Sequence, residues 1–133
     1  MQPSTLGERK LTRLDVFRLR KLITAGRLED LAELLDEADV LDPREIPADV
    51  VTMHAQVVIR ELDTQQLRTL ALRYPVDAAP AEGCVSVLSP VGMSLLGQRV
   101  GAVASWLAPG GEEHFVQVES ILYQPEATGD YLT

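Results

Sequence analysis

Few residues of this sequence have the types and spacing that catalysis or metal binding requires. The chain holds one cysteine and two histidines. His54 and His114 lie far apart, each beside a predicted strand, so they do not form a metal-ligand pattern. Cys84 lies in an apolar run, which indicates a buried strand thiol rather than a nucleophile. No P-loop, dinucleotide fingerprint or nucleophile elbow occurs. The sequence therefore predicts no catalytic residue, no metal site and no cofactor.

A stripe of arginines is a candidate binding feature. At 100° per residue, four side chains would project from one side of a helix, within about 40° of one another, if the helix persisted over all four positions: Arg9, Arg13, Arg20 and Arg27. One interpretation is a solvated face that balances a neighbouring acidic helix. The other is contact with an acidic or phosphate-bearing surface of a partner.

Two helices are needed to position this stripe. The first is predicted from residue 11 or 12 to residue 24 after a frayed start over residues 1–10, and its apolar side chains share one face: Leu11, Leu14, Leu19, Leu22 and Ile23. Ala25-Gly26 breaks the pattern, and a second helix with an acidic outer face follows over residues 28–38. Because the link is short, we expect the helices to pack antiparallel as a hairpin.

The charge distribution argues against nonspecific binding to nucleic acid. The formal net charge is −8, whereas such binding needs a basic footprint. Residues 1–30 carry a net charge of +3 and residues 31–49 carry −6, which suits a basic helix beside an acidic one. No apolar run approaches the roughly 18 residues of a membrane span, and the polar start lacks a signal-peptide core. We therefore expect a cytoplasmic protein.

The densest structural signals lie between residues 89 and 97. Ser89 can cap a helix with its hydroxyl, and Pro90 fits the first helical position. Val91 contributes to an apolar side, and Gly97 can end the helix in a left-handed conformation. Since only about seven or eight residues would be helical, this helix must pack against a sheet.

Strand patterns dominate from residue 50 onward. The predicted strands cover residues 50–53, 56–61, 67–74, 84–88, 100–107 and 115–123. A linker is expected over residues 40–49, turns near 63–64 and at 109–111, and a loop over 75–83. The Leu-rich run over residues 65–72 also fits a helix on its own.

Several of these segments, in their order and spacing, resemble a known family. A first set of motifs resembles the C-terminal domain of the Gre transcript-cleavage factors. These motifs lie at residues 87–90, 95–97, 100–101 and 109–111 and at Tyr123. The segments 47–53 and 123–132 resemble the short relatives of those factors, the regulator of nucleoside diphosphate kinase (Rnk) family. The resemblance covers residues 47–133 well and the N-terminal third only in outline.

This resemblance implies a fold and favours strand over helix at residues 67–74. The expected fold class is α+β. A short N-terminal antiparallel helical hairpin, residues 1–46, would form a short coiled coil. An FKBP-like antiparallel β-sheet domain with one short helix, residues 47–133, would follow it. Residues 124–132 are expected to fold back, with Tyr131 against the domain or the hairpin.

The resemblance also implies a partner and a function. Gre factors bind bacterial RNA polymerase, so this chain is expected to be a non-enzymatic transcription regulator that docks at the rim of the polymerase secondary channel. By carry-over from the Gre contact motif, Ser89, Pro90 and Val91 are the expected contact residues. Sequence-specific binding of nucleic acid is not expected.

The hairpin tip of the Gre factors carries acidic residues that hold a catalytic magnesium ion. The corresponding turn here contains Arg27, Glu29 and Asp30. Both acids suit the first turn of a helix, where they complement its dipole, and Arg27 stands beside them. The hairpin would also be shorter, about 21 Å for roughly 14 residues. We therefore expect occupancy of the channel in competition with Gre factors, without transcript cleavage.

Two other functions remain open at this point. The Rnk resemblance suggests a modulator that binds a metabolic enzyme such as nucleoside diphosphate kinase, although the sequence has no nucleotide site of its own. An FKBP-like fold raises the possibility of a prolyl isomerase or chaperone. The small number of aromatic residues, five per cent of the chain, argues against an aromatic-lined isomerase pocket.

Overall fold

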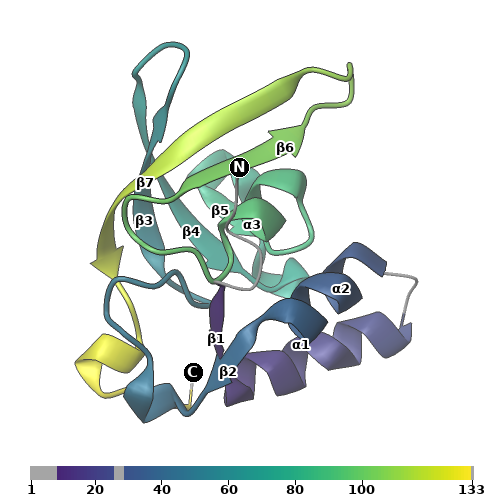
Figure 1. Cartoon of the computed structure of the whole chain (residues 1–133), viewed down its shortest axis with the longest axis vertical. Helices are drawn as coiled ribbons and strands as arrows, with labels where there is room; N and C mark the ends of the chain where they lie inside the picture. The colour runs from purple at the N-terminus through teal and green to yellow at the C-terminus, as the bar shows by residue number, and fades with distance from the viewer. Residues whose placement is uncertain (1–8, 26–28, 133) are drawn as a thin grey trace.

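The computed structural model of the chain describes residues 9–25 and 29–132 (Figure 1). It is a mixed α+β fold in which a helical hairpin lies against a twisted sheet. The hairpin does not stand away from the sheet as a separate rod: its two helices lie side by side beneath the sheet, at the lower right of Figure 1. No helix in the described residues has the length and apolar character to cross a membrane.

The hairpin helices begin and end close to their predicted limits. Helix α1 is Arg13–Ala25 and α2 is Glu29–Glu37. Thr12 precedes α1, and its Oγ1 accepts a hydrogen bond from the Asp15 N–H at 3.1 Å. This bond satisfies one of the N–H groups that a helix start leaves without a partner, which explains why α1 begins at Arg13.

Two short strands flank the hairpin, and the sequence analysis missed both. Strand β1, Lys10–Thr12, pairs in parallel with β2, Asp39–Leu41. The prediction of a frayed start through residue 10 is therefore wrong at its end, and so is the prediction of a linker that begins at residue 40. Three-residue strands show no periodicity in sequence, because their pairing depends on the hairpin that brings them together.

The main sheet has five strands in the order β5-β4-β3-β7-β6. All of its pairs are antiparallel except β4 with β5, which is parallel. The expected antiparallel sheet is thus correct apart from this pair. The strands are β3 Gln56–Glu61, β4 Leu67–Arg73, β5 Cys84–Ser86, β6 Val103–Leu107 and β7 Glu113–Tyr123.

The strand predictions differ in their outcome. The strand reading of residues 67–74 is confirmed over a helix, and the strand at 56–61 is confirmed at both ends. The predicted strand at 50–53 is wrong: this segment is buried loop, where the Val51 N–H donates to the Gln98 carbonyl at 2.8 Å. Strand β6 begins three residues later than predicted, because Gly101 has a positive φ of 95° in a turn.

The short helix α3, Pro90–Leu95, forms as predicted. Ser89 Oγ accepts a hydrogen bond from the Gly92 N–H at 3.1 Å, and Gly97 leaves the helix with a φ of 78°. Gly92 is required for space, since a Cβ there would lie 2.1 Å from the backbone oxygen of Ser86. The glycine thus allows α3 to lie directly against the chain that follows β5.

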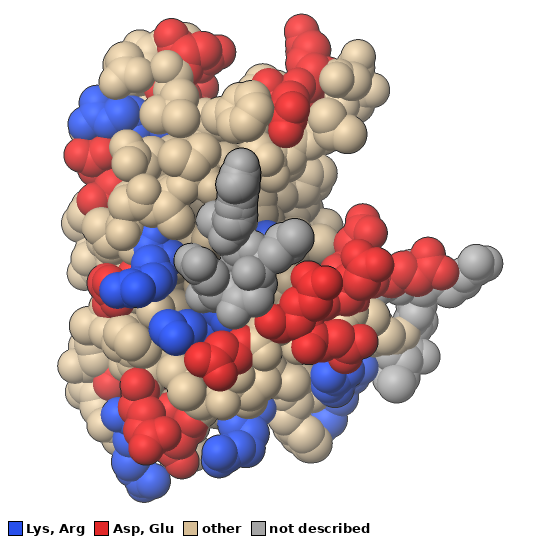
Figure 2. Space-filling view, viewed as in Figure 1, with Lys and Arg blue, Asp and Glu red and all other residues tan. Residues whose placement is uncertain are grey.

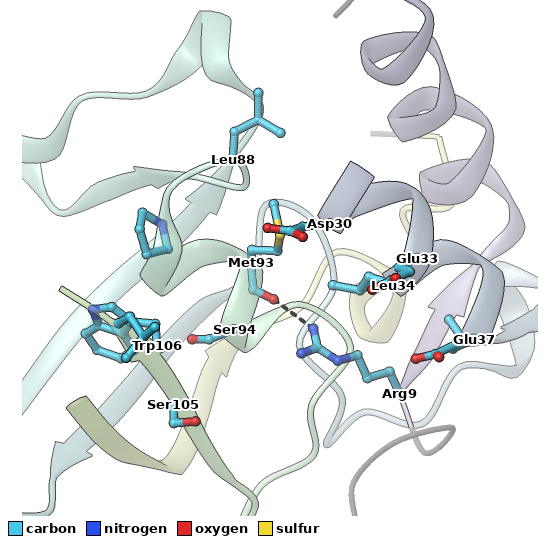
Figure 3. Close-up of a pocket in the computed structure, with 13 residues that line it drawn as sticks. Arg9, Asp30, Glu33, Leu34, Glu37, Leu88, Met93, Ser94, Ser105 and Trp106 are labelled. Atoms are coloured by element: carbon cyan, nitrogen blue, oxygen red, sulfur yellow. Dashed lines mark hydrogen bonds between the residues drawn. The ribbon is translucent and has the colours of Figure 1, made fainter. Parts of the chain in front are cut away.

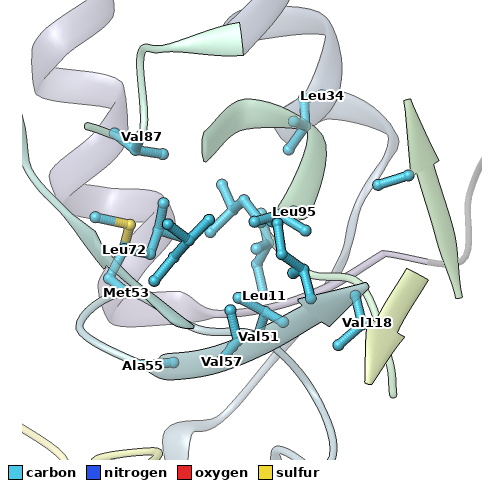
Figure 4. Packing of buried hydrophobic residues seen from close by; sticks show 14 of the residues in the cluster. Leu11, Leu34, Val51, Met53, Ala55, Val57, Leu72, Val87, Leu95 and Val118 are labelled. Carbon is cyan, nitrogen blue, oxygen red and sulfur yellow. The ribbon is translucent and has the colours of Figure 1, made fainter. Parts of the chain in front are cut away.

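One hydrophobic cluster joins the hairpin to the sheet (Figure 4). Leu19 from α1 and Leu31 from α2 belong to the same cluster as Leu72 from β4 and Leu95 from α3. Cys84, predicted to be buried, is only half-buried. The boundary between two domains at residues 46 and 47 stays a prediction.

The C-terminal segment folds back onto the molecule, as predicted. Gln124 is buried, and its Nε2 donates to the carbonyls of Pro47 and Val50, both at 2.8 Å. The Arg44 guanidinium lies 5.4 Å from the centre of the Tyr131 ring. These contacts tie the tail to the segment that connects the hairpin to the sheet.

Candidate docking cleft

A cleft of about 540 Å³ opens between α2, α3 and β6 (Figure 3). Each of these elements presents a different chemistry to the cleft. Figure 2 shows the acidic side chains of this region as a red row that projects from the molecule. Because the sequence elements that line the cleft are far apart in the chain, only the folded hairpin and sheet together create it.

The acidic wall comes from α2. Asp30, Glu33 and Glu37 line the cleft, and their spacing of three and four residues places them on one helical face. The opposite face of α2 is held in the core by Leu31 and Leu35, so the acids must face outward. None of the three acids forms an ion pair with another residue in the described ranges.

The apolar side of the cleft comes from α3 and β6. Leu88, Pro90 and Met93 contribute from α3 and the segment just before it, and Trp106 and Leu107 contribute from β6. Leu107 is 65% exposed. An exposed leucine beside a tryptophan and a methionine offers apolar area that a partner could bury.

Arg9 lines the cleft rather than joining a helical stripe. Its Nη1 donates to the carbonyls of Met93 at 2.7 Å and Leu96 at 3.0 Å, at the C-terminal end of α3 (Figure 3). Burial lowers the pKa of Arg9, and the charge of Glu37 partly opposes that effect. The predicted arginine stripe is thus wrong at Arg9. This residue precedes α1, which begins at Arg13, and its side chain is bound to the end of α3.

The other arginines of the stripe contact acidic neighbours. Arg13 lies 3.6 Å from an Asp42 oxygen, and Arg20 lies 3.1 Å from an Asp36 oxygen. This arrangement favours the interpretation of a solvated face that balances the acidic helix. Exposed pairs of this kind are weak and screened by salt, so a partner role for Arg13 and Arg20 stays a prediction. Arg27 lies outside the described residues.

The three predicted contact residues differ in how available they are. The hydroxyl of Ser89 already accepts from Gly92 and donates to the Ser86 carbonyl at 2.7 Å. Val91 is partly buried and packs against the core. Pro90 is exposed and lines the cleft. Of the three, Pro90 is therefore the residue best placed to touch a partner.

The predicted tip acids lie at the start of α2, as expected. Glu29 is exposed, whereas Asp30 points to the cleft. In the described part of the chain, no group of three or more His, Cys, Asp or Glu residues is placed to hold a metal ion. Of the two tip acids, only Asp30 contributes to the cleft wall.

Several cleft residues were missed by the sequence analysis. The sequence pattern placed Glu33 and Glu37 on the outer face of an acidic helix, and it placed Trp106 and Leu107 in a strand. It gave no sign that these four residues would line one cleft. The available signal was the concentration of acids between residues 31 and 49. The position of the acids opposite β6 could not be inferred, because it depends on the pairing of β1 with β2.

A buried carboxylate lies elsewhere, between α1 and the sheet. Asp15 is 1% exposed and accepts a hydrogen bond from the Met53 N–H at 3.2 Å. Loss of hydration on burial raises the pKa of Asp15 to about 6, although the bond from Met53 acts in the opposite direction. This group can titrate near neutral pH while it holds α1 against the loop before β3.

Comparison with known proteins identifies clear relatives. The family model for the C-terminal part of the transcription elongation factor GreA/GreB matches residues 46–123. The regulator of nucleoside diphosphate kinase from Escherichia coli K12 is 44% identical over 98 residues, which is 74% of this chain and 72% of that protein. The transcription elongation factor GreA of Chlorobium phaeobacteroides is 32% identical over 106 residues, 79% of this chain and 67% of that protein.

A solved structure extends this similarity to most of the chain. The prokaryotic transcription elongation factor GreA/GreB from Nitrosomonas europaea superimposes with a TM-score of 0.74 and 34% identity. The match covers 92% of this chain and all of that one. The shared fold therefore includes the hairpin as well as the sheet.

Proposed function

This chain belongs to the GreA/GreB transcription elongation factor family, and from that premise we propose that it is a non-enzymatic regulator that binds RNA polymerase. The observation that carries the proposal is the family match over residues 46–123, which contains Ser89, Pro90 and Val91. The names of the relatives describe regulators and elongation factors. The proposed docking site is the rim of the polymerase secondary channel.

Pro90 and the apolar side of the cleft are the proposed contact surface. Pro90 is exposed beside Met93 and Trp106, and a proline loses little conformational freedom when a partner covers it. The acids of α2, Asp30, Glu33 and Glu37, would contact basic groups of the partner at the border of this apolar surface. Charges at the border of an interface raise the association rate and make that rate depend on ionic strength.

The hairpin is proposed to occupy the channel without stimulating transcript cleavage. Helix α1 has 13 residues, so it is about 20 Å long at 1.5 Å per residue. Glu29 and Asp30 lie in the first turn of α2, where acids complement the helix dipole. A short hairpin without an evident magnesium pair would compete with Gre factors by occupancy alone. We also propose that the hairpin is a short coiled coil and that the sheet domain is FKBP-like.

A binding assay with purified bacterial RNA polymerase tests the contact surface. Ser89 is unsuitable for substitution, because its hydroxyl makes two internal hydrogen bonds. Pro90→Lys instead places a positive charge on the surface that would meet a basic partner. We expect it to weaken polymerase binding by about tenfold or more, equivalent to about 1.4 kcal/mol.

Pro80→Lys is the matched control, since Pro80 is also exposed and begins a turn away from the cleft. It should bind polymerase as the unchanged protein does. Equal binding by a folded Pro90→Lys variant would remove this surface from the proposed function.

A second candidate function is regulation of nucleoside diphosphate kinase. The name of the Escherichia coli relative that is 44% identical, a regulator of nucleoside diphosphate kinase, favours it. A pull-down from a bacterial lysate distinguishes the candidates by whether polymerase subunits or the kinase are recovered. A prolyl isomerase or chaperone is less well supported, because Trp106 is the sole aromatic residue among the described residues that line the cleft.

A further inference from the structure

We propose that the outer edge of β6 binds an extended, basic segment of a partner by strand addition. The inference rests on the proposed function in so far as this segment would belong to the docking partner. It assigns to the partner a conformation and a charge pattern that the family membership does not specify.

The outer edge of β6 has no partner strand within residues 9–25 and 29–132. Strand β6 is the last in the sheet order and pairs with β7 alone. Beyond its ends, the Val118 N–H donates to the Ala102 carbonyl at 2.9 Å, and the Ala108 N–H donates to the Glu112 carbonyl at 2.8 Å. Both bonds involve even-numbered residues, Ala102 and Ala108, which directly flank this strand.

These two bonds fix the direction of the other main-chain groups. In an antiparallel pair, every second residue exchanges hydrogen bonds with the neighbouring strand. The backbone groups of Ala104 and Trp106 therefore point toward β7. Those of Val103, Ser105 and Leu107 point outward from the sheet. The edge thus offers N–H and C=O groups at a spacing that matches another strand.

The edge lacks the features with which proteins usually prevent strand addition. Natural sheet edges are protected by charged residues, proline or bulges. Strand β6 reads Val103–Leu107 with no charged residue and no proline, and its register with β7 is regular. Val103 is 45% exposed and Leu107 is 65% exposed. Helix α3 packs against the same strand, so the exposed positions Val103 and Leu107 mark the part of the edge that a partner strand would reach.

The acidic side chains of the cleft indicate that the partner segment is basic. Ser105, Trp106 and Leu107 line the same cleft as Asp30, Glu33 and Glu37. A strand added to β6 would therefore share a cleft with three carboxylates. Figure 3 shows Met93 and Ser94 of α3 between Trp106 and these acids, so long basic side chains would have to reach past α3. Alternating Lys or Arg side chains would meet the acids, while apolar side chains between them would meet Met93 and Leu88.

A second copy of this chain is a poorer occupant. Pairing of two β6 edges would bring together two chains that each carry a net charge of −8. It would also place the acidic walls of the two copies near each other, where like charges repel. The occupant is thus a basic segment of another protein.

Peptide binding tests the inference without any polymerase. The probe is the blocked peptide Lys-Val-Lys-Val-Lys-Val-Lys, added to the isotope-labelled full chain at low salt. We expect saturable binding and slower hydrogen exchange of the amides of Val103, Ser105 and Leu107. The peptide Glu-Val-Glu-Val-Glu-Val-Glu should not bind, and added salt should weaken the binding of the basic peptide.

Two sets of variants separate backbone pairing from simple charge attraction. Ser105→Pro removes an outward N–H at an edge position, where proline is tolerated, and should weaken peptide binding by about tenfold or more. Ser105→Thr keeps the N–H and is the control. The double variant Glu33→Gln, Glu37→Gln keeps the edge and removes two charges, so it should weaken binding and reduce its salt dependence.

Three results would overturn the inference: no binding of the basic peptide, binding without protection of the three amides, or self-association of the chain through β6. Measurement of polymerase binding with the same variants keeps the two proposals apart. Peptide binding without polymerase binding would contradict the proposed function alone. Polymerase binding that Pro90→Lys weakens and Ser105→Pro leaves unchanged would contradict strand addition alone.

Discussion

At the scale of single residues, the fold depends most on positions where burial or a close contact permits only one type of side chain. Arg9 makes two hydrogen bonds to the end of α3, and Gly92 allows α3 to touch the backbone of Ser86. Asp15 is a carboxylate held out of water between α1 and a loop. Asp15 and Gly92 each give a measurable expectation about stability.

The contribution of Asp15 to stability should increase as the pH falls from neutral toward 5, while His54, whose pKa is lowered by burial, acts in the opposite direction. The pKa of Asp15 is raised from 3.8 to about 6, so the folded state binds this proton more tightly than the unfolded chain does. Protonation below pH 6 therefore stabilises the fold, by at most about 3 kcal/mol for a shift of this size. Above pH 6 the buried charge is destabilising.

Asp15→Asn tests this expectation, because an amide oxygen can still accept from the Met53 N–H. Urea unfolding of the unchanged protein and the variant should be compared at pH 7.5 and pH 5.5. The variant should show a smaller change in the free energy of unfolding between the two pH values. An equal change in both proteins would assign the pH dependence to other groups.

Gly92→Ala should destabilise the fold by about 1–3 kcal/mol, as expected for overpacking of a close contact. The added Cβ would lie 2.1 Å from a backbone oxygen that no side-chain movement can displace. Gly110→Ala is the control, since a Cβ at Gly110 meets nothing within 4 Å. Similar melting temperatures for the two variants would show that α3 shifts easily.

At the scale of elements, the long periodic segments could be predicted and the short paired ones could not. The amphipathic runs of α1 and α2 and the alternating run of β4 carry their structure in local pattern. Ser89, Pro90 and Gly97 mark both ends of α3 through their own backbone preferences.

Strands β1 and β2 have three residues each, too few for a pattern, and they form because the hairpin brings them together. The cleft could not be predicted for the same reason. Its acids and its apolar residues were visible in sequence, but their placement on opposite sides of one space depends on tertiary packing. Pro90 was predicted correctly as an exposed helix start, whereas the helical face predicted for Arg9 required the first helix to extend beyond its actual start at Arg13.

The C-terminal tail is an element whose contribution is testable. Gln124→Ala would remove the donor to the carbonyls of Pro47 and Val50. Buried carbonyls that lose their partner cost about 1–3 kcal/mol, so the melting temperature should fall. Leu132→Ala is the control, because this side chain is 81% exposed. An unchanged melting temperature for Gln124→Ala would mean that water replaces the lost bonds.

At the scale of the whole molecule, the hairpin and the sheet share one hydrophobic cluster. The same packing that unites them places the acids of α2 across a cleft from α3 and β6. In the proposed function, the cleft would serve as the docking surface, and the hairpin that packs against the sheet would enter the channel. The proposed role of a factor that acts by occupancy relies on these two features.

The most direct test of that account is a backtracked RNA polymerase elongation complex supplied with magnesium. The protein is added alone, and then in increasing amounts together with a Gre factor. We predict no cleavage by the protein alone and progressive slowing of Gre-stimulated cleavage, with Pro90→Lys less effective than Pro80→Lys. Cleavage by the protein alone that is lost in Glu29→Ala or Asp30→Ala would contradict the account, and so would Gre-stimulated cleavage that stays unchanged at saturating protein.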